Sequence, residues 1–208
     1  GKNGISAIIV PGGTPGLSFG KHEPKMGLRG SVSTAIMLED VRVPEQNLLG
    51  ERGRGFTQFL QVLDGGRIGI GAMAIGLAQA AFEAASAYAK ERTAFGKPIG
   101  AYESISNMIA DMDTGIAAAR LMVYQAAWLK DQGRPFAKQA AMAKLFASET
   151  AEQTCRNAIQ VFGGYGYSSE YPVERLYRDQ RLLTIGEGTS EILRVVIGRH
   201  VLGGFVGN

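Results

Sequence analysis

The longest continuous pattern in this sequence is helical, and it spans about Phe56 to Arg92. The segment is rich in Ala, Leu, Met, Gln and Glu, and Gly96 and Pro98 follow it as helix breakers. Several glycines lie inside it, and each costs up to about 1 kcal/mol relative to alanine in a helix interior. The sequence therefore predicts a fold built on long helices, with close packing or a ligand along this first one.

Further helical segments follow with short connections. The second is expected from about Tyr102 to Gln132, where apolar residues recur at spacings of three, four and seven. The third is expected from Pro135, at the first helical position where a missing N–H costs little, to Val161. A fourth follows Tyr171-Pro172 and reaches about Leu183, and a fifth begins near Thr189. This arrangement predicts an antiparallel bundle of the four-helix type with an extra C-terminal helix.

The β signals are concentrated in the first 50 residues, at Ile5–Val10, Val32–Leu38 and Val41–Val43. These are too few strands to close a sheet, so this part needs partners from elsewhere. The predicted fold is mainly α: residues 1–52 form a partial β-domain of a few antiparallel strands, and residues 53–208 form the helical bundle. Because the chain begins with Gly and enters a strand at once, we expect it to start in the middle of a longer protein.

Composition narrows the classes of function. The net charge of +3 is mild and the basic residues are interspersed with acids, which predicts neither nucleic-acid binding nor membrane attachment. No run approaches the roughly 18 apolar residues of a membrane helix, so we expect no membrane insertion. The single cysteine, Cys155, excludes an internal disulfide and suits the cytoplasm, where we expect it to be buried. His22 and His200 stand alone, so no metal site is predicted.

The stretch TIGEGTSEI places Glu187 between two glycines, directly before a predicted helix start. Thr189 is a good N-cap, so free N–H groups and the positive end of a helix dipole lie near this glutamate. The glycines remove two side chains, which lets a ligand approach backbone and carboxylate together. A base beside a backbone N–H suits the removal of a proton next to a carbonyl. A solvated loop carboxylate between turn glycines is the alternative reading.

Several motifs resemble, in unbroken order, those of the acyl-CoA dehydrogenase family. They are LDGGR at 63–67, ERTAFGKPI at 91–99, QVFGGYGY at 160–167, YPVER at 171–175 and GEGTSEI at 186–192. KMGLRGS at 25–31 and EDVRVP at 39–44 fit the end of the family's middle β-domain. The resemblance covers essentially the whole chain, and it implies the C-terminal portion of a flavin enzyme that oxidises acyl-CoA thioesters.

The resemblance assigns a role to each motif around Glu187. This residue matches the catalytic base that takes the α-proton of the acyl-CoA, while the β-hydrogen leaves as hydride to FAD and a trans-2-enoyl-CoA results. The expected substrate contacts are Asp64, Gly65, Gly66, Arg67 and Gly188. Arg67 also fits a structural ion pair. In some relatives the base is a glutamate at the position of Gly66, which here leaves Glu187 as the candidate.

The resemblance also implies FAD contacts. The residues that match those holding the pyrophosphate and adenosine of a neighbouring subunit's FAD are Arg92, Gln160, Val161, Phe162, Gly163 and Gly164. A guanidinium suits phosphate, although Gly163-Gly164 also fits a plain helix C-cap. Thr189, Ser190 and Glu191 match a further FAD-contacting segment, although helix capping explains them as well. The tyrosines at 165, 167 and 171 are expected to be packing residues.

The family implies an electron-transfer flavoprotein as electron acceptor, a homotetramer, and the mitochondrial matrix in a eukaryote. Two alternatives remain open from the sequence. One is an acyl-CoA oxidase, in which oxygen reoxidises the flavin. The other is a truncated, non-catalytic assembly or binding module that packs through its helices.

Overall fold

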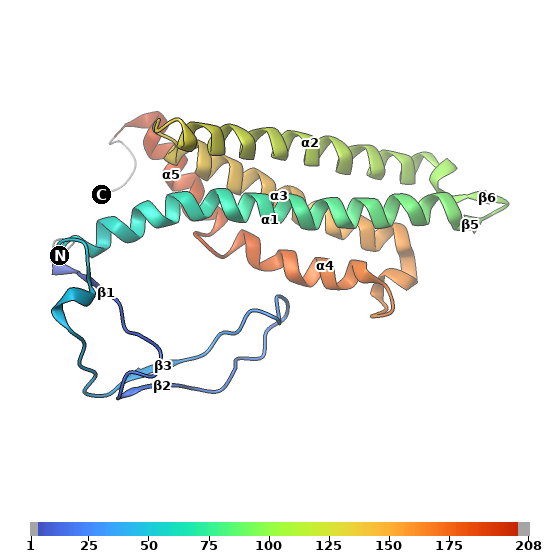
Figure 1. Ribbon diagram of the computed structural model, residues 1–208. Helices are drawn as coiled ribbons and strands as arrows, with labels where there is room; N and C mark the ends of the chain where they lie inside the picture. The colour runs from blue at the N-terminus through green and yellow to red at the C-terminus, as the bar shows by residue number, and fades with distance from the viewer. Residues whose placement is uncertain (1–3, 204–208) are drawn as a thin grey trace. The chain divides into compact units, whose positions relative to one another are not determined.

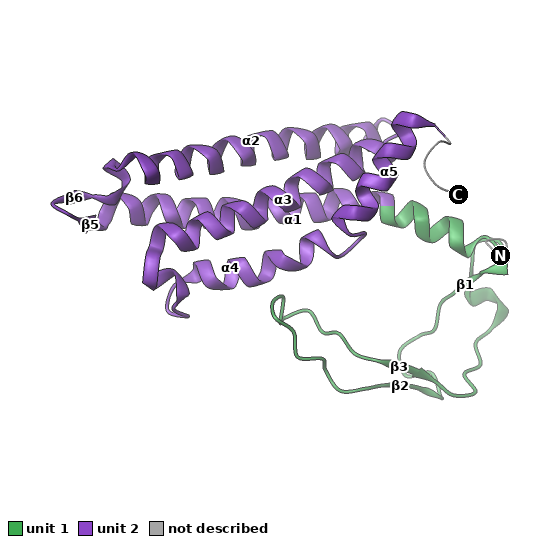
Figure 2. Cartoon of the chain, turned by 180° about the vertical axis from the view of Figure 1, so that it is seen from behind, with its two compact units in different colours: residues 1–63 green, residues 64–208 purple. Residues whose placement is uncertain are grey.

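The computed structural model describes residues 4–203, and the chain divides into two compact units (Figure 2). The first unit is Gly1–Leu63 and the second is Asp64–Asn208. The first long helix, α1 (Gly55–Glu91), begins in the first unit and continues through the second. The domain boundary expected between residues 52 and 53 stays a prediction.

The first unit consists of short antiparallel strand pairs. Its elements are β1 (Ala7–Ile8), β2 (Leu17–Phe19), β3 (Ile36–Leu38), the 3-10 turn η2 (Glu45–Asn47) and β4 (Leu48–Leu49). β1 pairs with β4, and β2 pairs with β3 so that Leu17 lies opposite Leu38. The strand expected at Val41–Val43 was wrong, since this stretch has no regular secondary structure. The three apolar residues of β3 are exposed within this chain, in line with a sheet that needs partners.

The second unit is a helical bundle, as predicted (Figure 1). It continues α1 and adds β5 (Thr93–Ala94), β6 (Lys97–Pro98), η3 (Ile99–Ala101), α2 (Glu103–Asp131), α3 (Ala137–Phe162), η4 (Gly163–Tyr167), α4 (Pro172–Gln180), η5 (Arg181–Thr184) and α5 (Ser190–Leu202). The helices α1, α2 and α3 lie side by side in alternating directions, and the small β5–β6 hairpin joins the first two. The fold is therefore mainly α, with a bundle followed by an additional C-terminal helix.

The bundle core is built largely from alanines, which allow the helix axes to approach closely. Its first cluster contains Ala74, Ile75, Ala78, Ile116, Ala119, Val123, Ala126, Ala140, Ala143, Ala147, Ala151 and Leu183. A Cβ added at Gly71 of α1 would lie 2.8 Å from the Cγ2 of Val123 in α2. At this position, close helix packing accounts for a glycine in α1, as the sequence suggested.

Details of the helical unit also differ from the sequence expectations. Pro135 is not the first residue of α3, which begins at Ala137. The backbone N–H groups of Gly133 and Arg134 still donate to carbonyls of α2, so the proline lies in the link between the two helices. Tyr167 is not a packing residue, because 90% of its surface is exposed. Cys155 is fully buried, as expected.

One described helix, α1, is long and apolar enough to cross a membrane by length and composition alone. A core helix of a soluble protein passes the same test, and α1 contributes Ala74, Ala78 and Ala81 to the buried interior of the bundle. This is weak support for a membrane span, and the expected lack of membrane insertion stays a prediction.

Candidate active site

The loop between η5 and α5 carries Glu187 in an unusual backbone conformation. Glu187 has φ +56° and Gly188 has φ +104°, so two consecutive residues lie in the region that L side chains seldom occupy. Thr189 then ends the loop as the N-cap of α5, and its hydroxyl accepts a hydrogen bond from the N–H of Ile192 at 3.3 Å. The predicted cap is confirmed, and it places the free N–H end of a helix close to Glu187.

The Glu187 carboxylate lies directly against α1. A Cβ built on Gly66 would be 2.5 Å from its Oε2 and 3.0 Å from its Cδ. Glycine at position 66 is therefore required for the carboxylate to stay where it is. The Oε2 atom is buried and, among the described residues, has no hydrogen-bond partner. A buried, unpaired carboxylate oxygen is costly in a folded protein, which makes it a candidate for a functional group.

The other residues predicted from the LDGGR motif lie on the same turns of α1. Arg67 is 7% exposed and its Nη1 forms an ion pair with the Asp64 Oδ1 at 2.7 Å. The structural role that the sequence left open for Arg67 is thus present. Its Nε is buried without a partner in the described part of the chain, so one donor of the guanidinium stays available. Gly65 faces the side chain of Lys130.

A residue that the sequence did not single out completes this cluster. Lys144 of α3 is fully buried, and its Nζ donates a hydrogen bond to the Gly188 carbonyl at 2.7 Å. Burial, followed by the neighbouring Arg67 charge, lowers the pKa of Lys144 to about 8, while Glu187 acts in the opposite direction. In the sequence, this lysine interrupts a face of α3 on which alanines recur at helical spacing. That interruption could have marked Lys144 as a candidate site residue.

The start of α5 offers two polar groups beside the loop. The Ser190 Oγ is buried and makes no hydrogen bond within residues 4–203. Glu191 is exposed in the first turn, and hydrogen bonds from its own backbone N–H and from Thr189 lower the pKa of its carboxyl group. The three residues from 189 to 191 therefore combine a capping role with an unpaired hydroxyl.

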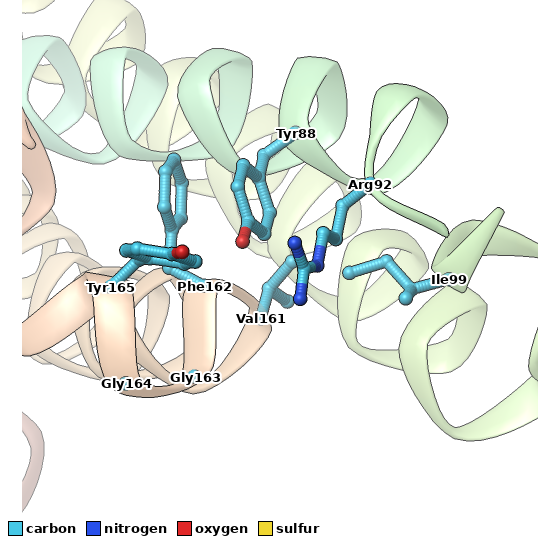
Figure 3. Close-up of a pocket in the computed structure, with 8 residues that line it drawn as sticks. All are labelled: Tyr88, Arg92, Ile99, Val161, Phe162, Gly163, Gly164 and Tyr165. Atoms are coloured by element: carbon cyan, nitrogen blue, oxygen red, sulfur yellow. The ribbon is translucent and has the colours of Figure 1, made fainter. Parts of the chain in front are cut away.

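The second predicted group lies at the far end of α1, around a pocket of about 450 Å³ (Figure 3). The pocket is lined by Tyr88, Arg92, Ile99, Val161, Phe162, Gly163, Gly164 and Tyr165. Five of the six expected FAD contacts are thus brought together. The sixth, Gln160, is exposed next to the pocket and does not line it. Tyr88 stacks on Phe162 with ring centroids 4.1 Å apart, so part of the lining also belongs to the core.

The residues of this pocket fit a ligand that carries both an anionic group and a planar aromatic ring. Arg92 is exposed and its guanidinium carbon lies 5.7 Å from the centroid of the Tyr165 ring, and within residues 4–203 no carboxylate is found paired with it. A Cβ built on Gly163 or Gly164 would meet no atom within 4 Å, so packing in this chain does not demand these glycines. Gly163 has φ +60°, which also suits the helix C-cap that the sequence left open.

The two groups are far apart on one helix. Arg92 comes 26 residues after Gly66, which corresponds to about 39 Å along the axis of α1 at about 1.5 Å per residue. This separation is longer than an extended dinucleotide. The residues around Glu187 and those around Arg92 in the same chain therefore cannot hold one and the same FAD molecule.

Residues 53–202 match the family model of the acyl-CoA dehydrogenase C-terminal domain. The chain belongs to the acyl-CoA dehydrogenase family. It is 59% identical over 202 residues to the probable acyl-CoA dehydrogenase YngJ of Bacillus subtilis, and the match covers 97% of this chain and 53% of that protein. The chain thus spans about half the length of the curated relatives it matches.

Solved structures of similar proteins share the fold of this acyl-CoA dehydrogenase family member. The butyryl-CoA dehydrogenase of Megasphaera elsdenii superimposes with a TM-score of 0.95 at 48% identity, covering 97% of this chain and 53% of that one. A chain from a study of the electron transferring flavoprotein of Acidaminococcus fermentans superimposes with a TM-score of 0.96 at 47% identity, covering 98% of this chain and 53% of that one. These similarities confirm the family and the fold predicted from the sequence motifs.

Proposed function

We propose that the protein carrying this chain is an FAD-dependent acyl-CoA dehydrogenase in which Glu187 is the catalytic base. The observation that carries the proposal is the buried, unpaired Oε2 of Glu187, held against Gly66 in the motif that the family shares. Support comes from the family membership of residues 53–202 and from relatives named as acyl-CoA dehydrogenases. A short-chain acyl thioester is the substrate class named for the butyryl-CoA relative.

In the proposed reaction the Glu187 carboxylate takes the α-proton of the thioester, and the electron pair of that C–H bond becomes the new C=C bond. The backbone N–H of Glu187 donates to the thioester oxygen and stabilises the charge that develops there. FAD, when bound, supplies an acceptor for the β-hydrogen as hydride, so that the product is a trans-2-enoyl-CoA. Asp64, Arg67 and Gly188 are the proposed substrate contacts in this chain.

The distance between the two residue groups supports an oligomeric enzyme. We propose that Arg92 and the Val161–Gly164 turn hold the phosphates and adenosine of one FAD, while Ser190 and its neighbours face the flavin of another. A homotetramer, as in the family, would bring the two ends of different chains together. The proposed electron acceptor is an electron-transfer flavoprotein, and the proposed location is the cytoplasm, or the mitochondrial matrix in a eukaryote.

The decisive test replaces Glu187 by glutamine in the full-length protein with FAD bound. Glutamine keeps the size of the side chain but cannot accept the proton, so anaerobic flavin bleaching by butyryl-CoA is expected to fall at least about 100-fold. Binding of butyryl-CoA is expected to persist. Glu83→Gln, at an exposed position of α1, is the matched control. Equal bleaching in the Glu187 variant and the control would instead favour a protein in which this glutamate has no catalytic role.

A further inference from the structure

Lys144 is the least expected residue in the bundle. It is fully buried on α3, and the neighbouring positions Ala140, Ala143 and Ala147 of the same face are buried alanines. A lysine in such surroundings loses hydration that an apolar residue of similar size would not lose. Burial of the ammonium lowers the pKa of Lys144 to about 8. The buried surroundings thus destabilise the charged form of Lys144, which indicates that this residue has a role beyond packing.

The contact made by the ammonium indicates that role. The Nζ of Lys144 donates to the Gly188 carbonyl at 2.7 Å, across 44 residues of sequence. Gly188 follows Glu187, and both have positive φ. A non-glycine residue in this conformation persists only where surrounding contacts fix it. The hydrogen bond from Lys144 is such a contact, and it reaches the loop from a different helix.

Within residues 4–203, the other hydrogen bonds of this loop hold its two ends. On one side, the N–H groups of Ile185 and Gly186 donate to the Leu182 carbonyl at 2.9 and 2.8 Å. On the other side, Thr189 caps α5. The residues in between, Glu187 and Gly188, are the ones whose backbone direction sets where the carboxylate points. Lys144 therefore holds the part of the loop that the caps leave free.

Charge supports the same assignment. Among charged groups, Arg67 repels the Lys144 ammonium most strongly, and Glu187 attracts it most strongly. Glu149 and Glu191 attract it less. Glu149 is engaged with Arg194 at 2.6 Å, and Glu191 is exposed on α5. The buried ammonium is thus attracted by Glu187, while its hydrogen bond goes to the backbone of the next residue, Gly188.

We propose that Lys144 is a positioning residue of the Glu187 site: its ammonium holds the Gly188 carbonyl and thereby fixes the direction of the Glu187 carboxylate. This inference rests on the proposed function of Glu187 as the base. It assigns a role to a residue on α3, away from every motif that identified the family. Lys144 acts through the loop and does not touch the substrate.

The test uses Lys144→Met in the full-length protein with FAD bound, because methionine fills a similar volume without a donor or charge. Lys138→Met is the matched control, since Lys138 is a half-buried lysine on the same helix. Single-turnover flavin reduction is followed over a range of butyryl-CoA concentrations, which separates the limiting rate from the half-saturating concentration. Amide hydrogen exchange is measured in parallel for residues 185–189 and for α2.

The expected result is a limiting rate at least about tenfold lower with a half-saturating concentration changed by no more than about twofold. Exchange of the loop amides should rise about tenfold while that of α2 stays unchanged. The control should alter neither readout. Unchanged loop exchange, or faster exchange in α2 as well as the loop, would show a general packing role and overturn the assignment.

A second variant keeps the proposal testable. Where Lys144→Met does not fold, Lys144→Gln replaces it, because the amide is polar but shorter and uncharged, and the same criteria apply. If neither the Lys144→Met protein nor the Lys144→Gln protein folds, Lys144 is a structural residue and the proposal is overturned. If no acyl-CoA bleaches the flavin of the unsubstituted protein, the proposed function is wrong whatever the Lys144 variants show. Hydrogen exchange then still decides whether Lys144 holds the loop.

Discussion

Replacing Gly66 by alanine should separate stability from catalysis. Gly66 lies in a regular part of α1, so alanine gains up to about 1 kcal/mol of helix propensity. The new Cβ would lie 2.5 Å from the Glu187 Oε2, whereas ordinary van der Waals contact begins at 3.4 Å. The carboxylate sits at the end of a side chain that can rotate, so it is the group that moves, by about 0.9 Å.

A displacement of this size is small for folding and large for proton transfer. A misplacement of about 1 Å can reduce a catalytic rate on the order of 100-fold, which is about 2.7 kcal/mol. The Gly66→Ala protein should therefore be as stable as the unsubstituted one, or slightly more stable, and yet reduce its flavin about 100-fold more slowly. Urea unfolding followed by circular dichroism gives the first quantity, and anaerobic flavin bleaching by butyryl-CoA in the full-length protein gives the second.

Gly69 supplies the control on the same helix. It is exposed, and a Cβ added there would meet no atom within 4 Å. Gly69→Ala should show the same gain in stability with an unchanged bleaching rate. If the two alanine variants bleach equally fast, the carboxylate does not lie against Gly66 and the placement of the base is wrong. If Gly66→Ala unfolds more readily, the loop is too rigid to release the carboxylate.

Three further outcomes follow from buried and capping groups. Burial lowers the pKa of Lys144 in the folded protein to about 8 from its ordinary value of 10.5, so the unfolded chain binds more protons between these two pH values. The charged groups around Lys144 are Arg67, Glu187, Glu149 and Glu191. The free energy of unfolding should therefore rise by about 2 kcal/mol from pH 8 to 10, relative to that of the Lys144→Met protein. Urea unfolding at several pH values measures this difference. Burial raises the pKa of the Cys155 thiol to about 12, so iodoacetamide at pH 8 should leave the native protein unlabelled and add one group after denaturation, as seen by mass spectrometry. Labelling of the native protein would show that α3 opens. Thr189→Ala removes the N-cap of α5 and should cost about 1 kcal/mol in urea unfolding, and an unchanged midpoint would mean that another group caps the helix.

The helices could be predicted because their signals are local. The ends of α1 and α2 fall within a residue or two of the expected positions, since Gly96 and Gly133 interrupt the helical pattern. Pro135 misled because its position depends on how the preceding helix finishes, with Arg134 still bonded to Leu129. The hairpin of β5 and β6 was missed for a similar reason: its glycine and proline read as helix breakers, although they also suit a tight turn.

The site was predictable only in part. Glu187 stands out because two glycines flank it, and the family motifs led to Asp64–Arg67 and Arg92. Contacts between distant segments leave no comparable pattern in the sequence. The approach of Gly66 to Glu187 and the bond from Lys144 to Gly188 depend on how three helices pack, and a lysine in a helix usually indicates a solvated face. The short strands depend on partners in the same way, which explains why Val41–Val43 was expected to be one and is not.

The length of α1 has a genetic consequence. Because Gly66 and Arg92 lie about 39 Å apart on one helix, the proposed enzyme draws the base and the phosphate contact of each site from different chains. A chain with Glu187→Gln and a chain with Arg92→Ala are each expected to be inactive alone. Mixed in one oligomer, they can still combine an intact base from one chain with an intact arginine from the other. Two defective alleles of this protein would then complement each other in the same cell.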